Sequence, residues 1–220
     1  MKQLTIDDVA DAAGGFNKIN QLGQRINNRY LRERVDKWIG EKLDVAHGLN
    51  LHQTNSTKKL LDIGTGAGWF PFICKLYGHN CIGTDISGRP EYDPVYEFFN
   101  IPFTEMLVHP FKSMPLTEKY DYITAMRAFF PQRPRAWEKN EWQYFFKDAR
   151  KHLNTDGALY ISANSGSKHD KRYNKLPNDQ KSHWGNLELK LWFDPYIIKY
   201  RSKKNTLYIT YNNIEQLLND

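Results

Sequence analysis

The chain has 220 residues, the length of one ordinary domain with room for an elaboration. Hydrophobic residues make up 40% and aromatic residues 14%, which is sufficient for a globular core, and no apolar run is long enough to span a membrane. The formal net charge is +6, and the segment 168–204 accounts for it with ten Lys or Arg residues against four acids. A basic segment favours anionic partners, although a solvated loop and hairpin turn would have the same composition.

The N-terminal residues and the cysteines predict a reduced compartment. Residues 1–8 contain no apolar core of a signal peptide. Cys74 falls in a predicted helix and Cys81 in a predicted strand, and neither has another Cys or a His at metal-ligand spacing. We therefore expect two reduced core thiols, no metal, no membrane association and a cytoplasmic location.

Residues 17–49 are predicted to be helical, because apolar residues recur there at intervals of three and four. Gly23 and Gly40 weaken the pattern and could split the segment. Residues 50–59 are polar and predict a linker. The apolar positions of the helical segment are Ile19, Leu22, Ile26, Tyr30, Leu31, Val35, Trp38, Ile39 and Leu43.

A glycine-rich motif follows the linker. The apolar residues Leu60, Leu61 and Ile63 predict a short strand, and a helix is predicted from about residue 67 to 77. Three glycines between them permit a tight turn and a close approach of the backbone to a ligand. These glycines are Gly64, Gly66 and Gly68.

Asp85 lies at the C-terminal end of the next predicted strand, residues 80–86. In open α/β sheets, ligands bind at that edge. An acid about 20 residues beyond a glycine loop suits the hydroxyls of a ribose.

The loop differs from a dinucleotide-binding fingerprint. That fingerprint has a third glycine for close packing of helix against strand, and Trp69 stands in its place. Asp62, a carboxylate just before the loop, would repel phosphates but would suit a ligand ammonium or sulfonium. S-adenosylmethionine combines a ribose with a cationic amino-acid end and has no phosphate. An ordinary tight turn between strand and helix is the alternative reading.

These residues resemble the class I S-adenosylmethionine-dependent methyltransferases. The first motif of that family, acid-x-Gly-x-Gly-x-Gly, is matched by residues 62–68, and its second-strand acid is matched by Asp85. The resemblance covers residues 58–211. It implies S-adenosyl-L-methionine as cofactor, an N-terminal helical segment at 1–57 that caps the substrate, and a methyltransferase core at 58–220. The cofactor-binding residues it implies are Asp62, Gly64, Thr65, Gly66, Gly68, Trp69, Phe70, Asp85, Ile86, Phe111 and Met126.

One stretch departs from the family pattern. After the third strand the family often has an acid that reaches the adenine amino group, whereas residues 109–112 contain none. We therefore expect adenine to be held by apolar packing on Phe111 or Ile86 and by backbone groups.

The rest of the chain predicts an alternation of helices and strands. The predicted elements are a helix at 92–100, a third strand near 104–109, a fourth strand at 119–126, an irregular loop at 129–139, a helix at 141–153, a turn at 154–157, a fifth strand at 158–162, a polar loop at 164–186, and a hairpin of residues 196–200 and 206–211. The resemblance implies an α/β, Rossmann-like, mostly parallel seven-stranded sheet. Its order would be 3-2-1-4-5-7-6, with strand seven antiparallel and helices on both faces.

Methyl transfer from a sulfonium is an in-line displacement, so an enzyme mainly aligns the reactants and excludes water. An oxygen or nitrogen acceptor can also need a general base. His109 is a candidate base or a structural histidine, and Arg127 is a candidate ligand for an anionic substrate or a solvent-facing side chain. Asn164, His169 and His183 are further candidates. An aromatic pocket could be lined by Phe129, Phe130, Trp137 and Trp142, although core packing would explain Trp142 equally well.

Three function classes fit the sequence. The first is a methyltransferase acting on a small polar or anionic molecule, which the intact motif favours. The second is an RNA methyltransferase that uses the basic segment 168–204. The third is a non-catalytic cofactor-binding protein. The sequence indicates neither the methyl acceptor nor an oligomeric state.

Overall fold

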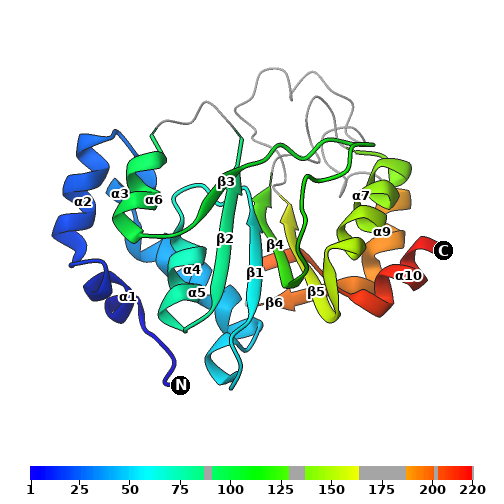
Figure 1. Cartoon of the computed structure of the whole chain (residues 1–220), viewed down its shortest axis with the longest axis horizontal. Helices are drawn as coiled ribbons and strands as arrows, with labels where there is room; N and C mark the ends of the chain where they lie inside the picture. Colours follow the sequence, from blue (N-terminus) through cyan, green and yellow to red (C-terminus); the bar gives the residue numbers. More distant parts are fainter. Residues whose placement is uncertain (87–90, 129–136, 164–186, 201–202, 220) are drawn as a thin grey trace. The chain divides into compact units, whose positions relative to one another are not determined.

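The computed structural model describes residues 1–86, 91–128, 137–163, 187–200 and 203–219. The chain forms two compact units, unit 1 (residues 1–105) and unit 2 (residues 106–220). Figure 1 shows helices and strands in both units.

Three parallel strands form the centre of unit 1, and they are β1 (Lys59–Ile63), β2 (Asn80–Asp85) and β3 (Phe103–Glu105). β1 pairs with β2 from Lys59 opposite Asn80 to Ile63 opposite Thr84, and β2 pairs with β3 through Asp85 opposite Glu105. The side chains of residues 60–63 are all buried, which is typical of a parallel strand covered on both faces. The third strand is shorter than the predicted 104–109.

Helices connect and cover these strands. α5 (Trp69–Leu76) joins β1 to β2, and α6 (Asp93–Phe99) lies between β2 and β3. The N-terminal helices are α1 (Ile6–Ala12), α2 (Phe16–Arg25), α3 (Arg29–Arg32) and α4 (Val35–Gly48), followed by the short 3₁₀ helix η1 (Leu51–Gln53). α4 packs beside α5, so the N-terminal segment belongs to the core of unit 1 (Figure 1).

The predicted helical segment 17–49 is interrupted twice, but not at its glycines. Asn27 and Arg34 adopt left-handed backbone conformations, with φ of 53° and 54°, and these residues separate α2, α3 and α4. Gly23 and Gly40 lie inside helices instead. Gly23 has a packing role, because a Cβ there would come 2.8 Å from the main-chain carbon and Cβ of Leu31.

α1 precedes the segment 17–49 that apolar periodicity predicts to be helical, and its start has a recognisable signal. The side chain of Thr5 accepts a hydrogen bond from the main-chain N–H of Asp8, and the Asp8 carboxylate accepts one from the N–H of Thr5. This reciprocal cap satisfies two donors that the first turn of a helix otherwise leaves open.

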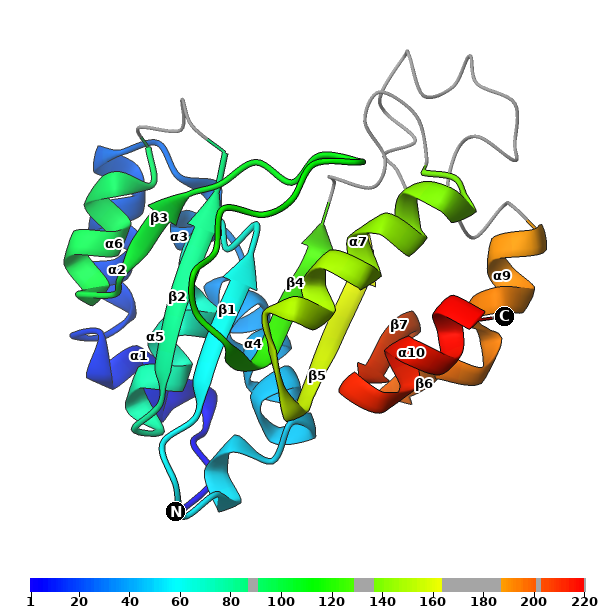
Figure 2. The same ribbon diagram turned by 45° about the vertical axis from the view of Figure 1, so that its right-hand side comes forward.

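Unit 2 contains β4 (Tyr120–Ala128), β5 (Leu153–Ala163), β6 (Ile197–Tyr200) and β7 (Lys203–Thr210). β4 and β5 are parallel, whereas β7 is antiparallel to both β5 and β6. Its helices are α7 (Lys139–Lys151), α9 (Leu187–Phe193), the 3₁₀ helix η4 (Asp194–Tyr196) and α10 (Tyr211–Asn219). α10 packs against α7, β5 and β7 (Figure 2). α9 and α10 were not predicted.

Over the described residues the strands follow the order β3-β2-β1 in unit 1 and β4-β5-β7-β6 in unit 2. The predicted α/β fold is therefore confirmed, with seven strands, the predicted order within each unit and an antiparallel β7.

The turn predicted at 154–157 is a bulge within β5. Tyr120 pairs with Leu153 and Tyr122 with Ala158, so residues 154–157 have no regular partners. A Cβ on Gly157 would lie 2.9–3.0 Å from the carbonyl oxygens of Asn154, Asp121 and Tyr120. The bulge therefore needs glycine for close backbone approach.

The two helical glycines of unit 1 give a matched test of packing. Gly40→Ala should raise the free energy of unfolding by about 0.5–1 kcal/mol, because alanine favours helix and its Cβ would meet the end of the Ile6 side chain, at 3.4 Å from Cδ1 and 3.9 Å from Cγ1. Gly23→Ala should lower it by about 1–3 kcal/mol, because its Cβ would overlap the α3 backbone. Urea unfolding followed by circular dichroism measures both, and a shift in the same direction for the two variants would contradict this packing.

Candidate functional site

The glycine loop of unit 1 is fixed to the C-terminal end of β2. The main-chain N–H groups of Gly64 and Thr65 both donate to the carbonyl of Thr84, at 2.7 and 2.9 Å. Gly64, Gly66 and Gly68 have φ values of 72°, 56° and 69°, which residues with a Cβ rarely adopt. The three glycines predicted to form a tight turn therefore do so.

The glycines differ in what surrounds them. A Cβ on Gly64 would have no atom of the described residues within 4 Å, so the loop is open to them on that side. A Cβ on Gly68 would lie 2.5 Å from Ile101 Cδ1, so Gly68 allows α5 to begin close to the start of β3. Gly83 plays a similar part, because its Cβ would lie 2.8 Å from the Thr65 side chain. Among the described residues, the loop thus has room for a ligand beside Gly64 and Gly66, where a Cβ on Gly66 would meet only the Tyr92 hydroxyl at 4.0 Å.

The carboxylate of Asp85 is oriented by two main-chain donors. Its Oδ2 accepts from the N–H of Gly66 at 3.0 Å, and its Oδ1 accepts from the N–H of Ile86 at 2.8 Å. A carboxylate has about four acceptor positions, so each oxygen can still accept a hydrogen bond. The side chain is half-buried and can reach a ligand at the edge of the strands.

Gly66 is held on its other side by a tyrosine. The hydroxyl of Tyr96 donates to the Gly66 carbonyl at 2.9 Å, and the Tyr96 ring stacks on Phe103 with centroids 4.2 Å apart. Burial, reinforced by the charge of Asp85, raises the pKa of the Tyr96 phenol well above its usual range. The hydroxyl therefore remains a proton donor under physiological conditions.

Two polar side chains are buried beneath the loop. Asp62, the acid predicted to face a ligand cation, is only 1% exposed. Thr65 is 6% exposed, and its hydroxyl has no hydrogen-bond partner among the described residues.

Trp69 and Phe70 lie in the core of unit 1, where they are 2% and 0% exposed. The Trp69 ring packs on Phe99, and its indole N–H donates to the carbonyl of Tyr30 at 3.4 Å. Both residues thus fix the start of α5, and Trp69 also ties it to α3. Ile86, the last residue described after β2, is half-buried.

Three of the predicted site residues in unit 2 differ in exposure. Met126 is buried in β4, whereas His109 is exposed. Phe111 is 55% exposed, adopts a φ of 59°, and makes an edge-to-face contact with Tyr144 at 5.8 Å. Phe111 is thus the only one of the three that presents a large apolar surface.

Arg127 lies in a bulge near the C-terminal end of β4. Its φ is 54°, and the strand pairing passes from Met126 opposite Ser162 to Ala128 opposite Ala163. A bulge of this kind re-aims a side chain, and it recurs next to active sites. The exposed Arg127 side chain is therefore set apart from the regular alternation of the strand.

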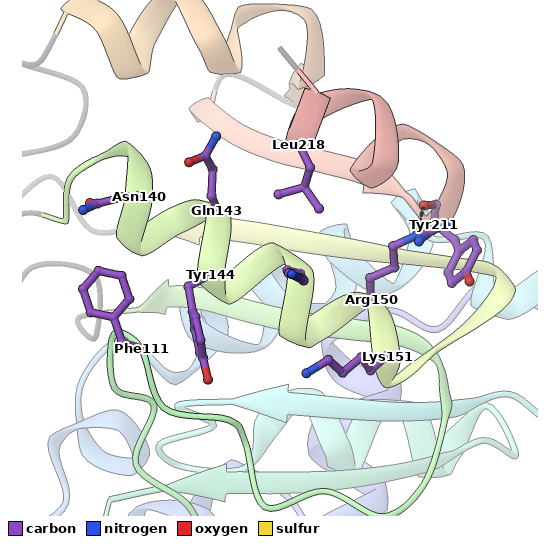
Figure 3. A pocket seen from close by; sticks show the side chains of 9 residues that line it. Phe111, Asn140, Gln143, Tyr144, Arg150, Lys151, Tyr211 and Leu218 are labelled. Carbon is purple, nitrogen blue, oxygen red and sulfur yellow. Dashed lines mark hydrogen bonds between the residues drawn. The ribbon is translucent and has the colours of Figure 1, made fainter.

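A groove of about 680 Å³ in unit 2 is lined by α7, α10 and Phe111. Figure 3 shows the side chains that line it. Two of its cations are paired. Arg150 forms an ion pair with Glu215 at 2.6 Å and stacks over Tyr211, and Lys151 pairs with the buried Asp148 at 3.2 Å. These contacts mainly join α7 to α10 and stabilise α7 itself.

Trp137 and Trp142 belong to the core of unit 2. They are 2% and 0% exposed, and their rings lie 5.5 Å apart. The cluster continues through Phe145, Phe146 and Phe193. These two tryptophans therefore do not line an aromatic pocket, and core packing explains them. Phe129, Phe130 and the loop 164–186, with Asn164, His169 and His183, lie outside the described residues.

Within the described ranges, no group of three or more His, Cys, Asp or Glu side chains could hold a metal ion. In the same ranges no helix is long and apolar enough to cross a membrane. Cys74 and Cys81 are buried free thiols, as predicted.

The sequence matches no protein-family model, and no curated protein matches it. Similar solved structures include a TehB-like SAM-dependent methyltransferase from Corynebacterium glutamicum, with 17% identity, a TM-score of 0.44, and coverage of 66% of this chain and 72% of that one. The ribosomal protein L11 methylase from Lactobacillus delbrueckii subsp. bulgaricus has 13% identity, a TM-score of 0.46 and coverage of 76% of each chain. The glycopeptide N-methyltransferase MtfA complexed with sinefungin has 12% identity, a TM-score of 0.40, and coverage of 63% of this chain and 53% of that one. At these values the similarities do not assign a function to this chain.

Tyr96 was not among the predicted site residues. Its tertiary role depends on α6 approaching the glycine loop, which no local pattern reveals. The only signal is its position on the helix that follows Asp85, where Tyr92, Tyr96 and Phe99 share one buried face.

The raised pKa of Tyr96 predicts a loss of stability in alkali. Above about pH 10 the unfolded chain releases the phenolic proton while the folded chain keeps it, so the free energy of unfolding should fall as pH rises. Tyr96→Phe should reduce this dependence, and Tyr77, Tyr122 and Tyr208, whose pKa values are also raised by burial, should supply the rest. Urea unfolding between about pH 8 and pH 11 measures the effect. An unchanged slope in Tyr96→Phe would contradict it.

Proposed function

We propose that this chain is a class I S-adenosylmethionine-dependent methyltransferase that acts on a small polar or anionic molecule. One observation carries the proposal. The Asp85 carboxylate is held by the N–H groups of Gly66 and Ile86, beside an open glycine loop, with acceptor capacity left for two ligand hydroxyls. This is the chemistry that recognises a ribose diol.

The loop is less suited to a dinucleotide. Trp69 occupies the position of the third glycine and is buried against Phe99, so the loop has a different packing from that fingerprint. Asp62 places a buried carboxylate next to the loop. A carboxylate there disfavours a pyrophosphate and favours a positively charged ligand.

S-adenosyl-L-methionine fits these residues, since it has a ribose, a cationic end and no phosphate. When bound, it supplies the methyl group of its sulfonium. Asp85 would accept hydrogen bonds from the ribose hydroxyls, and the open side of the loop would admit the amino-acid end near Asp62. We also propose that Ile86, Phe111 and Met126 contribute apolar contacts to adenine.

For the acceptor, we propose a small polar or anionic molecule. The support is the exposed Arg127 in its β4 bulge, which can bind an anion, and the exposed His109, a candidate general base. Residues 1–57 would cap the substrate, and residues 58–220 would form the methyltransferase core. The cap proposal is supported by the bond from the Trp69 indole to the carbonyl of Tyr30, which ties α3 to the residue after the glycine loop.

An RNA acceptor is the second candidate, because residues 168–204 carry the whole formal excess of positive charge. Single-stranded RNA would bind with an affinity that falls with salt, at a slope of roughly −0.7 per neutralised phosphate. A cofactor-binding protein without catalysis is the third candidate and would bind S-adenosylmethionine without turnover.

The cofactor assignment predicts the effect of removing the Asp85 carboxylate. Asp85→Ala should weaken S-adenosylmethionine binding on the order of tenfold or more, because charge-assisted hydrogen bonds contribute about 1.5–3 kcal/mol each. Calorimetric titration measures the dissociation constant. Asp11→Ala, at an exposed acid of α1, is the control and should bind like wild type. Equal affinity of wild type and Asp85→Ala, or tight NADH binding without S-adenosylmethionine binding, would refute the assignment.

The acceptor class predicts where a labelled methyl group is found. With S-adenosylmethionine labelled on its methyl group, incorporation should occur into a fraction of small metabolites and should be lost in Asp62→Ala. Removal of the charges of Lys171, Arg172 and Lys175 should leave that incorporation unchanged. Incorporation into bulk RNA that is abolished by the same charge removal would overturn the small-molecule proposal.

A further inference from the structure

Gly66 is anchored through both of its main-chain polar groups. Its N–H donates to Asp85 Oδ2 at 3.0 Å, and its carbonyl accepts from the Tyr96 hydroxyl at 2.9 Å. Glycine has the widest backbone freedom of any residue, and Gly66 adopts a φ of 56°. Two hydrogen bonds at one such residue therefore fix both of its neighbouring peptide planes.

Tyr96 is itself held firmly. It is 5% exposed, its ring stacks on Phe103, and a Cβ on Gly68 would lie 3.5 Å from that ring. The side chain thus belongs to a wall of α6 and β3 on which the loop rests. Its hydroxyl cannot turn away without disturbing this packing.

The same N–H of Gly66 orients the carboxylate of Asp85. Tyr96 fixes Gly66, and Gly66 fixes Asp85, so the three groups form a connected chain of hydrogen bonds. A site whose groups are already oriented spends less binding free energy on ordering them.

We infer that Tyr96 is a positioning residue for the nucleoside part of the cofactor, acting through Gly66 on the carboxylate of Asp85. This inference rests on the proposed function, because it assumes that Asp85 binds a ribose diol. Tyr96 itself need not touch the cofactor.

Tyr96→Phe removes only the hydroxyl and keeps the stacked ring. The variant should bind S-adenosylmethionine about three- to tenfold more weakly, because the loop and Asp85 would no longer be held in one geometry. The KM for S-adenosylmethionine should rise by the same factor while kcat changes little, since the residue does not act on the reacting atoms.

Tyr77→Phe is the matched control. Tyr77 is 1% exposed, and its hydroxyl accepts a hydrogen bond from the main-chain N–H of Leu4 at 2.8 Å and forms another with His47 Nε2 at 2.8 Å. Both variants lose a buried hydroxyl, and the free energy of unfolding should fall at least as far in Tyr77→Phe as in Tyr96→Phe, because the Tyr77 hydroxyl has two hydrogen-bond partners. Only Tyr96→Phe should lose affinity.

A double-mutant cycle with Asp85→Asn tests whether Tyr96 affects S-adenosylmethionine affinity through Asp85. If Tyr96 acts through Asp85, the two changes should be less than additive in affinity, and Tyr96→Phe should have little further effect once Asp85 is Asn. Calorimetric titration of the full chain with S-adenosylmethionine gives all four dissociation constants. Additive losses, or an equal loss in Tyr77→Phe, would overturn the positioning role.

The outcomes separate the two proposals. Binding by wild type with unchanged affinity in Tyr96→Phe would overturn this inference and leave the proposed function standing. Absence of S-adenosylmethionine binding by wild type would overturn both.

Discussion

The carbonyl of Thr84 accepts hydrogen bonds from the main-chain N–H groups of both Gly64 and Thr65, and the geometry of the candidate site depends on this pair of hydrogen bonds. These two hydrogen bonds fix the loop after β1 to the end of β2. Asp85 is the next residue along β2, so the loop and the carboxylate share one rigid frame. The bond from Gly66 to Asp85 then closes a second link between the same two segments. A ligand therefore meets a loop and an acid whose relative positions are set by the strands.

The electrostatics of this frame restrict the ligand. The main-chain N–H groups of a glycine loop usually attract phosphate. Here the N–H groups of Gly64, Thr65 and Gly66 are already bonded to protein acceptors, and Asp62 and Asp85 add negative charge nearby. A loop with its donors occupied and two acids beside it favours hydroxyls and cations over anions. The glycines thus allow the left-handed backbone conformations of the loop, and the N–H groups of Gly64, Thr65 and Gly66 are not available to an anion.

The sequence predicted best what short-range chemistry determines. The glycine loop, the strand on each side and the acid of β2 all lie within 26 residues, 60–85, and their positions follow from backbone conformation and strand period. The helical segment 17–49 was correct in type but wrong in its breaks. Asn27 and Arg34 adopt left-handed conformations, whereas Gly23 is retained for contact with Leu31. Tertiary contacts decide which residues end a helix and which glycines stay inside one because a neighbouring segment packs closely against them.

Tertiary contacts also explain the other differences between the sequence predictions and the structure. Trp69 and Phe70 match the motif positions, but the helix phase directs both side chains into the core. The aromatic residues near α7 have the composition of a pocket, yet Trp137 and Trp142 pack on each other in the interior. Tyr96 shows the reverse case. Its residue type and spacing suggest only core, and its hydroxyl acquires a role because α6 brings it to the Gly66 carbonyl.

The residues proposed to contact a nucleoside and those proposed to contact an acceptor differ in their structural surroundings. The contacts that fit a nucleoside come from the strand ends and the glycine loop of unit 1, where burial and paired main-chain groups leave little freedom. The candidate groups for an acceptor, His109 and Arg127, are exposed side chains of unit 2, one in a connecting segment and the other in a bulge. Exposed positions outside regular pairing tolerate substitution better than buried strand ends. Substitutions at these two residues are therefore expected to leave the hydrogen-bonded frame of unit 1 unchanged.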